Sequence, residues 1–185
     1  VPVNKDRRPG PGDYELDVSG MYILPGLIDM HAHVGGSAQG TPAEYVFKLW
    51  MGHGITTIRD PGSGNGMAWM REARARSAEN TITAPRIHAY AFFGSGDHDF
   101  DLNTPKGVRE WIRWAAEEEQ ADGVKFLGLQ PDLFEAALDE AARHGLRTAC
   151  HHAQLYVSRA NVLHSARWGL TTMEHWYGLP EALFT

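Results

Sequence analysis

Short apolar runs alternate with longer segments of helical periodicity through most of this chain. The clearest helical segment places Val108, Trp111, Ile112, Ala115 and Ala116 at i, i+3, i+4, i+7 and i+8, which puts them on one helix face. Most strand-type runs are apolar throughout, as expected when both faces of a sheet are covered. The predicted strands are residues 21–33, 55–59, 86–93, 124–127, 146–152 and 170–175, and the predicted helices are residues 41–52, 65–78, 104–116, 131–145 and 154–168. This alternation predicts consecutive βα units around a parallel sheet.

The regularity of the alternation favours a TIM-type (β/α)8 barrel over an open sheet. A complete barrel usually needs about 250 residues, and only about six βα units are present. We therefore predict an α/β fold in which residues 23–185 form an incomplete barrel. Residues 1–22 are polar and rich in Pro and Gly, and Tyr14–Val18 alternates in polarity. This segment is predicted to be a short N-terminal β segment, the edge of a small sandwich domain.

Local signals define where the elements begin. Thr41-Pro42 and Thr104-Pro105 predict helix starts in which the threonine is the N-cap and the proline occupies the first helical position. Residues 21–33 are predicted to be a core strand interrupted by Pro25.

Composition narrows the classes of partner. The chain has 185 residues, of which 43% are hydrophobic and 22% charged, and its net charge is −6. The acidic balance gives no reason to expect nucleic acid or an acidic membrane surface as a partner, and no apolar run approaches the roughly 18 residues that span a bilayer. We expect a small-molecule substrate.

Cys150 is the only cysteine, so neither a disulfide framework nor a Cys-rich metal site is expected. The chain begins at Val1 without a hydrophobic signal region, which favours the cytoplasm and leaves a secreted or periplasmic location open if a signal peptide was removed.

Histidines follow the predicted strands at the end where a parallel barrel carries its functional groups. His31 and His33 are spaced i, i+2, so in a strand their side chains and that of Asp29 point the same way. The other strand ends carry Lys125, the pair His151-His152, and the pair Glu174-His175. Imidazole suits zinc and similar divalent ions, which supply hydroxide at neutral pH and polarise a scissile carbonyl. A lysine desolvated in an apolar strand is pushed towards the neutral amine, which can add carbon dioxide to form an anionic carbamate.

Several ordered segments resemble the metal-dependent amidohydrolases, near the imidazolonepropionase-like and prolidase-like dipeptidase branch. The resemblance runs from about residue 14 to the last residue, and the Pro-Gly-Leu-Ile-Asp-x-His-x-His segment is its most specific part. The matching segments are Leu24 to His33, Gly54 to Asp60, Ala84 to Ile87, Ala121 to Lys125, Cys150 to Ala153 and Met173 to His175.

This resemblance implies a set of ligands for one or two divalent metals, with zinc expected first and manganese, iron or cobalt as alternatives. His31 and His33 correspond to the ligands of the more buried metal, and Lys125 to a carboxylated lysine that bridges two metals. A fifth-strand histidine and His175 correspond to the ligands of the second metal. Because the family places a small residue after the fifth-strand ligand, His152 is favoured and His151 is kept as the alternative. Asp29 and Glu174 are expected to orient the ligand imidazoles, and His98 is a candidate substrate contact.

The resemblance implies a metal-dependent hydrolase of C–N bonds in amides, cyclic amides or dipeptides, acting through metal-bound hydroxide. The family's general base is an aspartate after the eighth strand, and this chain ends after the sixth, so the catalytic base is unassigned and the chain alone is expected to be poorly active. The alternatives are an inactive fragment or degenerate member that binds metal without turnover, and one part of a split enzyme with a complementing C-terminal chain. Assembly into a homo-oligomer is a further alternative. An open-sheet nucleotide-binding protein is disfavoured, since no glycine-rich phosphate loop follows a strand.

Overall fold

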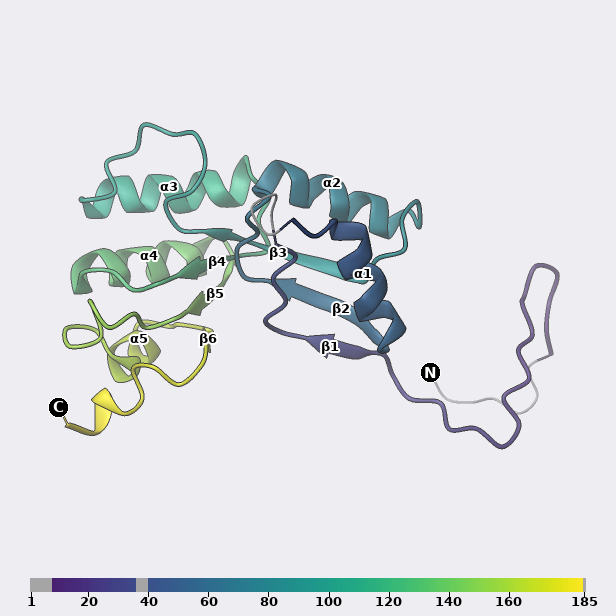
Figure 1. The fold of residues 1–185 in the computed structure, drawn as a ribbon. Helices are drawn as coiled ribbons and strands as arrows, with labels where there is room; N and C mark the ends of the chain where they lie inside the picture. The colour runs from purple at the N-terminus through teal and green to yellow at the C-terminus, as the bar shows by residue number, and fades with distance from the viewer. Residues whose placement is uncertain (1–7, 36–39, 185) are drawn as a thin grey trace.

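The computed structural model describes residues 8–35 and 40–184. Helices and strands alternate along the chain from the first strand to the last (Figure 1). The strands are β1 (Leu27–Asp29), β2 (Ile55–Asp60), β3 (Arg86–Phe92), β4 (Gly123–Phe126), β5 (Arg147–Cys150) and β6 (Thr172–Met173). The helices are α1 (Ala43–Gly52), α2 (Met67–Ala78), α3 (Pro105–Glu117), α4 (Pro131–Arg143), α5 (Val162–Arg167) and the 3-10 helix η2 (Glu181–Phe184). Among the described residues, no helix is long and apolar enough to cross a membrane.

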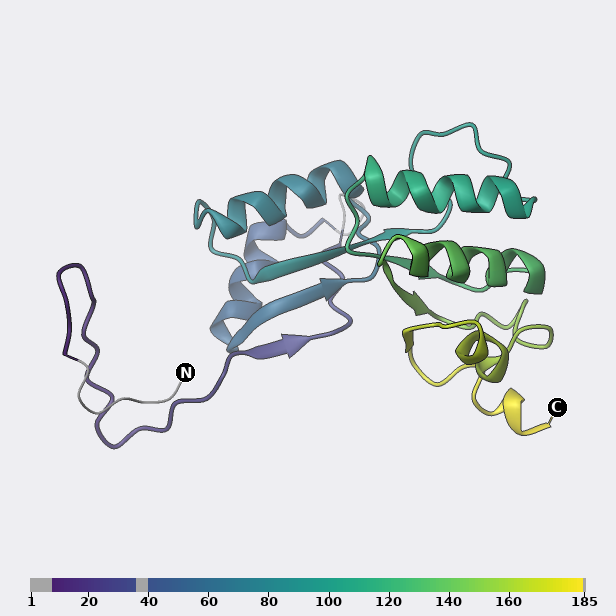
Figure 2. The same cartoon turned by 180° about the vertical axis from the view of Figure 1, so that it is seen from behind.

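All six strands are parallel and pair in the order of the sequence, from β1 to β6. The sheet curls into a half-barrel with α2, α3 and α4 along its outer face, where α3 and α4 pack side by side (Figures 1 and 2). The predicted incomplete TIM-type α/β barrel is therefore confirmed. Because every strand runs in the same direction, all six carboxyl ends meet at one rim of the half-barrel.

Two apolar clusters fill the space between the sheet and the helices. One lies under α1 and α2 and is centred on Phe47, Ile58 and Met70. The larger one lies under α3 and α4, where Trp111 and Phe134 are fully buried. On β3 and β4 the residues in these clusters alternate along the strand, which leaves the intervening residues to face the inside of the half-barrel.

The N-terminal part differs from the sequence-based expectation. Residues 8–26 contain neither strand nor helix, and the chain leads away from the sheet (Figure 1). Residues 14–18 are not part of a strand in this structure, and the sandwich edge predicted for residues 1–22 stays a prediction. The predicted core strand over residues 21–33 shrinks to β1, with Tyr22 97% and Ile28 61% exposed. The physical reason is that β1 is the edge of the sheet and pairs only with β2.

The structure can also be compared with the predicted helix starts and with the predicted last helix. Thr104 is the N-cap of α3, where its Oγ1 accepts a hydrogen bond from the Gly107 N–H at 3.1 Å. The cap predicted at Thr41 is wrong, since Pro42 precedes α1 and no side chain caps that helix. The helix predicted for residues 154–168 is confined to α5, which Asn161 caps after a run of turns.

Candidate metal centre

The loop after β1 brings two imidazoles together. The Nε2 atoms of His31 and His33 lie 3.1 Å apart, and their ring centroids are 4.9 Å apart. The Nδ1 atom of His31 contacts the Glu174 carboxylate, while the Nδ1 atom of His33 lies 3.7 Å from Asp60 Oδ1. Each ring therefore turns one nitrogen towards a carboxylate and the other towards its neighbouring histidine. A carboxylate at Nδ1 leaves Nε2 as the nitrogen available to a metal.

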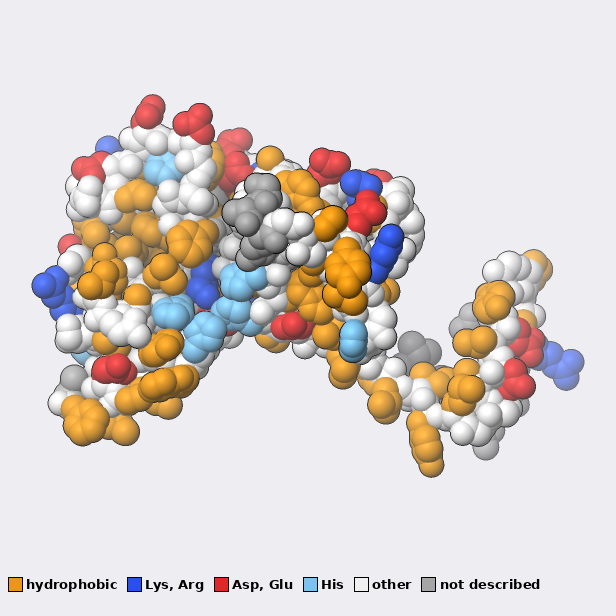
Figure 3. Space-filling model, viewed as in Figure 1, with side chains coloured by type: hydrophobic (Ala, Val, Ile, Leu, Met, Phe, Trp, Pro, Cys, Tyr) orange, Lys and Arg blue, Asp and Glu red, His pale blue; other side chains and the backbone are white. Residues whose placement is uncertain are grey.

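The ends of β5 and β6 extend this pair into a row of four histidines. The ring of His175 lies 4.8 Å from that of His31, and the ring of His151 lies 4.9 Å from that of His175. His175 has a φ of 61°, in the left-handed region. Regular strand alternation would send the side chains of Glu174 and His175 to opposite faces, whereas this backbone turn directs both towards His31. Figure 3 shows histidine side chains gathered beside a basic side chain in a hollow of the surface.

His152 faces away from this row, so the orientation predicted for the His151-His152 pair is wrong. Its Nε2 lies 2.9 Å from Ser165 Oγ, and its side chain is 1% exposed beneath the chain segment at Gly178. Cys150, the last residue of β5, belongs to the core under the helices. Alternation from that position sends His151 into the half-barrel and His152 back towards the helices. His151 is therefore the histidine that joins His175.

Lys125 lies inside the half-barrel on β4 and is 3% exposed. Its strand neighbours in register are Phe92 of β3 and Ala149 of β5. Burial lowers the pKa of its ammonium group, and the negative charge of Glu174 opposes this shift only in part. Desolvation therefore favours the neutral amine, which is the form that reacts with carbon dioxide.

Burial also lowers the pKa values of His31 and His151. For His31 the hydrogen bond to Glu174 acts in the opposite direction, and for His151 the neighbouring His175 adds to the lowering. Burial by itself would raise the pKa of Glu174, but its bonds to Thr172, His31 and Arg59 outweigh this and lower the pKa. These shifts favour neutral rings at His31 and His151, the form that metal ligation requires, next to a carboxylate that stays ionised.

The other predicted residues lie in different places. Glu174 contacts the His31 imidazole, and its role in orienting a metal ligand stays a prediction. The Asp29 carboxylate accepts a hydrogen bond from the His31 backbone N–H at 3.0 Å and so shapes the loop rather than a ring. His98 stacks on Phe100 and packs beside Trp114 of α3, and none of its ring contacts is with the histidine row.

Two residues at the end of β2 contribute to the site although no role was predicted for them. Asp60 is fully buried, with Oδ2 accepting from the Val34 N–H at 3.1 Å and Oδ1 facing His33 without a hydrogen bond. Arg59 donates to Glu174 Oε1 at 2.6 Å. The sequence could have indicated a role for both residues, because two charged residues end an otherwise β-branched strand at the rim that carries functional groups.

The spacing of one pair of imidazole nitrogens fits metal binding, whereas the described side chains do not form one complete set of ligands. Two nitrogen ligands on a tetrahedral zinc, with bonds of about 2.0–2.1 Å, lie about 3.3 Å apart, close to the 3.1 Å between the Nε2 atoms of His31 and His33. Across the described ranges 8–35 and 40–184, no three His, Cys, Asp or Glu side chains form a complete metal-holding group as they stand. The residues therefore fit a divalent ion in donor chemistry and in the spacing of one pair.

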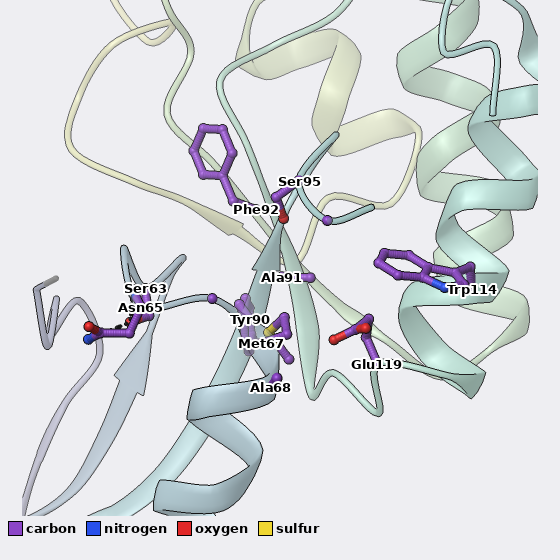
Figure 4. Close-up of a pocket in the computed structure, with 12 residues that line it drawn as sticks. Ser63, Asn65, Met67, Ala68, Tyr90, Ala91, Phe92, Ser95, Trp114 and Glu119 are labelled. Atoms are coloured by element: carbon purple, nitrogen blue, oxygen red, sulfur yellow. Dashed lines mark hydrogen bonds between the residues drawn. The ribbon is translucent and has the colours of Figure 1, made fainter. Parts of the chain in front are cut away.

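A separate cavity of about 260 Å³ lies outside the half-barrel, between the loop after β2, the end of β3 and α3 (Figure 4). Trp114 and Glu119 line one side and Ser63 and Asn65 the other. Glu119 is already paired with Arg71. None of the residues that line this cavity belongs to the histidine row, so it is distinct from the candidate centre.

The buried His152 predicts a specific dependence of stability on pH. Burial, assisted by the neighbouring His151, lowers the pKa of His152 from 6.5 to about 4. The unfolded chain therefore binds an extra proton between these values, and stability falls as the pH drops from 6.5 towards 4. The expected loss is about 3 kcal/mol. We expect urea unfolding in the presence of chelator to show this extra loss in the unmodified chain relative to His152→Gln. Equal losses in the two proteins would contradict the assignment.

Comparison with known proteins places the chain in a family. Residues 22–184 match the amidohydrolase family, and the chain belongs to it. It is 47% identical over 139 residues to an adenine deaminase of Methanoculleus marisnigri, covering 67% of this chain and 26% of that protein. It is 31% identical over 172 residues to an adenine deaminase of Bacillus velezensis, covering 85% of this chain and 29% of that protein. The family predicted from the sequence is confirmed.

Solved structures support the same fold. A crystal structure of an amidohydrolase aligns with a TM-score of 0.66 at 20% identity, covering 92% of this chain and 52% of the other. At this level of identity the likeness concerns the fold alone. The chain spans 26–29% of the length of the two curated relatives.

Proposed function

We propose that this chain forms the metal centre of a hydrolase that cleaves C–N bonds in small molecules. The observation that carries the proposal is the row of four imidazoles at the carboxyl ends of the strands, with the Nε2 atoms of His31 and His33 at 3.1 Å. Family membership supports hydrolysis as the reaction class. The names of the curated relatives support a C–N bond as the target.

In this proposal the ligands divide between two metal positions. His31 and His33 would hold the first ion, His151 and His175 would hold the second, and a carbamate on Lys125 would supply an anionic oxygen ligand. His151 takes the place that was predicted for His152, because it is the one that lies beside His175. Zinc is the expected metal, since neutral imidazole and anionic oxygen are among its preferred ligands.

The chain's own residues would then divide the work of hydrolysis. A bound divalent ion supplies Lewis acidity, which polarises a carbonyl and makes water more acidic. Glu174 keeps the His31 ring in the tautomer whose Nε2 is free, and Asp60 faces the Nδ1 side of His33. The open inner face of the half-barrel beside Lys125 is where a small substrate would approach these groups.

Metal analysis of the purified chain tests the proposal. We expect at least about one equivalent of tightly held divalent metal after gel filtration at pH 7.5, and loss of that metal on acidification as the imidazoles become protonated. His53→Ala serves as a control, since this histidine lies at the end of α1 and bonds to Leu49. A metal content that stays near zero after loading with zinc, manganese, iron or cobalt would refute a metal centre.

The curated relatives favour one second candidate, the deamination of adenine, because both are named adenine deaminases. Ammonia release from adenine, compared with hydrolysis of a cyclic amide and a dipeptide by the metal-loaded protein, separates the candidates. Turnover of adenine alone supports deamination. Metal binding without turnover of any of them supports the alternative of a metal-binding member without activity.

A further inference from the structure

Arg59 makes more contacts across the half-barrel than its place on β2 requires. Its guanidinium donates to Glu174 Oε1 at 2.6 Å through Nη2 and to Thr172 Oγ1 at 2.9 Å through Nη1. Its Nε donates to the Met30 carbonyl oxygen at 2.5 Å, and its Cζ lies 5.3 Å from the centre of the Tyr90 ring. The side chain is 5% exposed. All three nitrogens of the guanidinium are therefore used, and in three directions.

These bonds join opposite ends of the sheet. Arg59 belongs to β2 and Met30 follows β1, whereas Thr172 and Glu174 lie on or after β6, at the other edge. The strand order places β6 four strands from β2, so the bonds form only because the sheet curls. They hold the end of β6 against the loop that carries His31. The row of histidines takes members from both sides of this junction.

The same bonds continue to a ligand imidazole. Glu174 is 5% exposed, and its Oε1 accepts from both Arg59 and the Thr172 hydroxyl, the latter at 2.8 Å. Its other oxygen, Oε2, is left to face the Nδ1 atom of His31. An ionised carboxylate can only accept, so the proton of a neutral His31 ring must sit on Nδ1. The Nε2 lone pair is then free and directed at His33.

We propose that Arg59 is a positioning residue, which holds Glu174 so that His31 keeps the tautomer and orientation with Nε2 open to a metal. The role of this arrangement in metal binding rests on the proposed function. Lysine cannot replace arginine here, because a single ammonium on a flexible chain cannot reproduce a planar fork that reaches three acceptors at once.

The test compares Arg59→Lys and Arg59→Met with the control Arg74→Met. Arg74 also makes two hydrogen bonds, to Asp122 and the Gln120 carbonyl oxygen, but lies on α2 outside the half-barrel. One measurement is the tautomer of His31 in the metal-free chain, from long-range ¹H–¹⁵N spectra of the imidazoles. The other is zinc affinity by chelator competition. We expect Nδ1–H in the unmodified chain and the control, a mixture of tautomers in both Arg59 variants, and zinc binding about 10–100-fold weaker in those variants.

The outcomes separate this inference from the proposed function. An unchanged tautomer and unchanged zinc affinity in folded Arg59→Lys would overturn the positioning role, even if the unmodified chain binds zinc. An altered tautomer in a chain that never binds zinc would overturn the metal centre and support the positioning of His31. If the Arg59 variants do not fold, Thr172→Val removes one acceptor of the guanidinium and one donor to Glu174. A normal His31 tautomer and zinc affinity in that variant would likewise count against the inference.

Discussion

Replacing His151 with alanine is expected to weaken zinc binding by about 100-fold or more, whereas replacing His152 with alanine should leave zinc affinity unchanged. The two residues are neighbours in sequence, but only His151 lies beside His175, with ring centroids 4.9 Å apart. Loss of a residue that orients a ligand costs about 10–100-fold in affinity, so loss of a ligand itself should cost at least the upper value. Chelator competition on the two variants gives the comparison directly.

His152→Ala should instead lower the free energy of unfolding. The substitution removes a side chain that is 1% exposed and leaves the buried Ser165 hydroxyl without the imidazole 2.9 Å away. The hydroxyl keeps its bond to the Val162 carbonyl oxygen at 3.3 Å, so the lost hydrogen bond costs about 0.5–1.5 kcal/mol and the space left by the ring adds to this. The pair thus provides matched controls, one for the metal and one for the fold. If His152→Ala lost zinc while His151→Ala kept it, the assignment of the fifth-strand ligand would be reversed.

Lys125→Ala is expected to lower zinc affinity by at least about tenfold, with partial recovery on addition of formate or acetate. Lys125 lies 3% exposed on β4, and burial lowers its pKa towards the neutral amine that a carbamate requires. A short carboxylate added to the variant supplies the missing anionic oxygen in the space that the side chain vacates. The measurement is the metal content after gel filtration, with and without the added acid.

Lys48→Ala is the control for this experiment, since Lys48 is an exposed lysine on α1. It should retain the zinc content of the unmodified chain and show no response to formate. Retention of zinc by Lys125→Ala at the level of the unmodified chain would rule out the bridging role. Loss of zinc without recovery in either acid would leave Lys125 as a residue of the site and argue against a carbamate.

The sequence predicted the arrangement of the half-barrel well, because the information is local. The amphipathic spacing of Val108, Trp111 and Ile112 and the N-cap at Thr104 depend on residues a few positions apart, and α3 forms as they indicate. The extent of β1 was not predictable in this way. Apolar residues such as Ile28 resemble those of a core strand, but β1 lies at the sheet edge and is largely exposed.

The candidate site also has features that the sequence determined and features that needed the tertiary structure. Chain order alone determined that His31, His33, Lys125 and His175 lie at one rim, because parallel strands in sequence order bring all their carboxyl ends together. The choice between His151 and His152 needed the tertiary structure, since a shift of one residue reverses every side chain of a strand.

The contacts of Arg59 and Glu174 were likewise decided only by the fold. The two residues are 115 positions apart and lie towards opposite edges of the sheet, so no local pattern relates them. The turn at His175, with its positive φ, is also a property of the folded backbone. Sequence determined which groups reach the rim, and the curl of the sheet decided which of them meet, because distances across a curled sheet depend on the packing of every strand between.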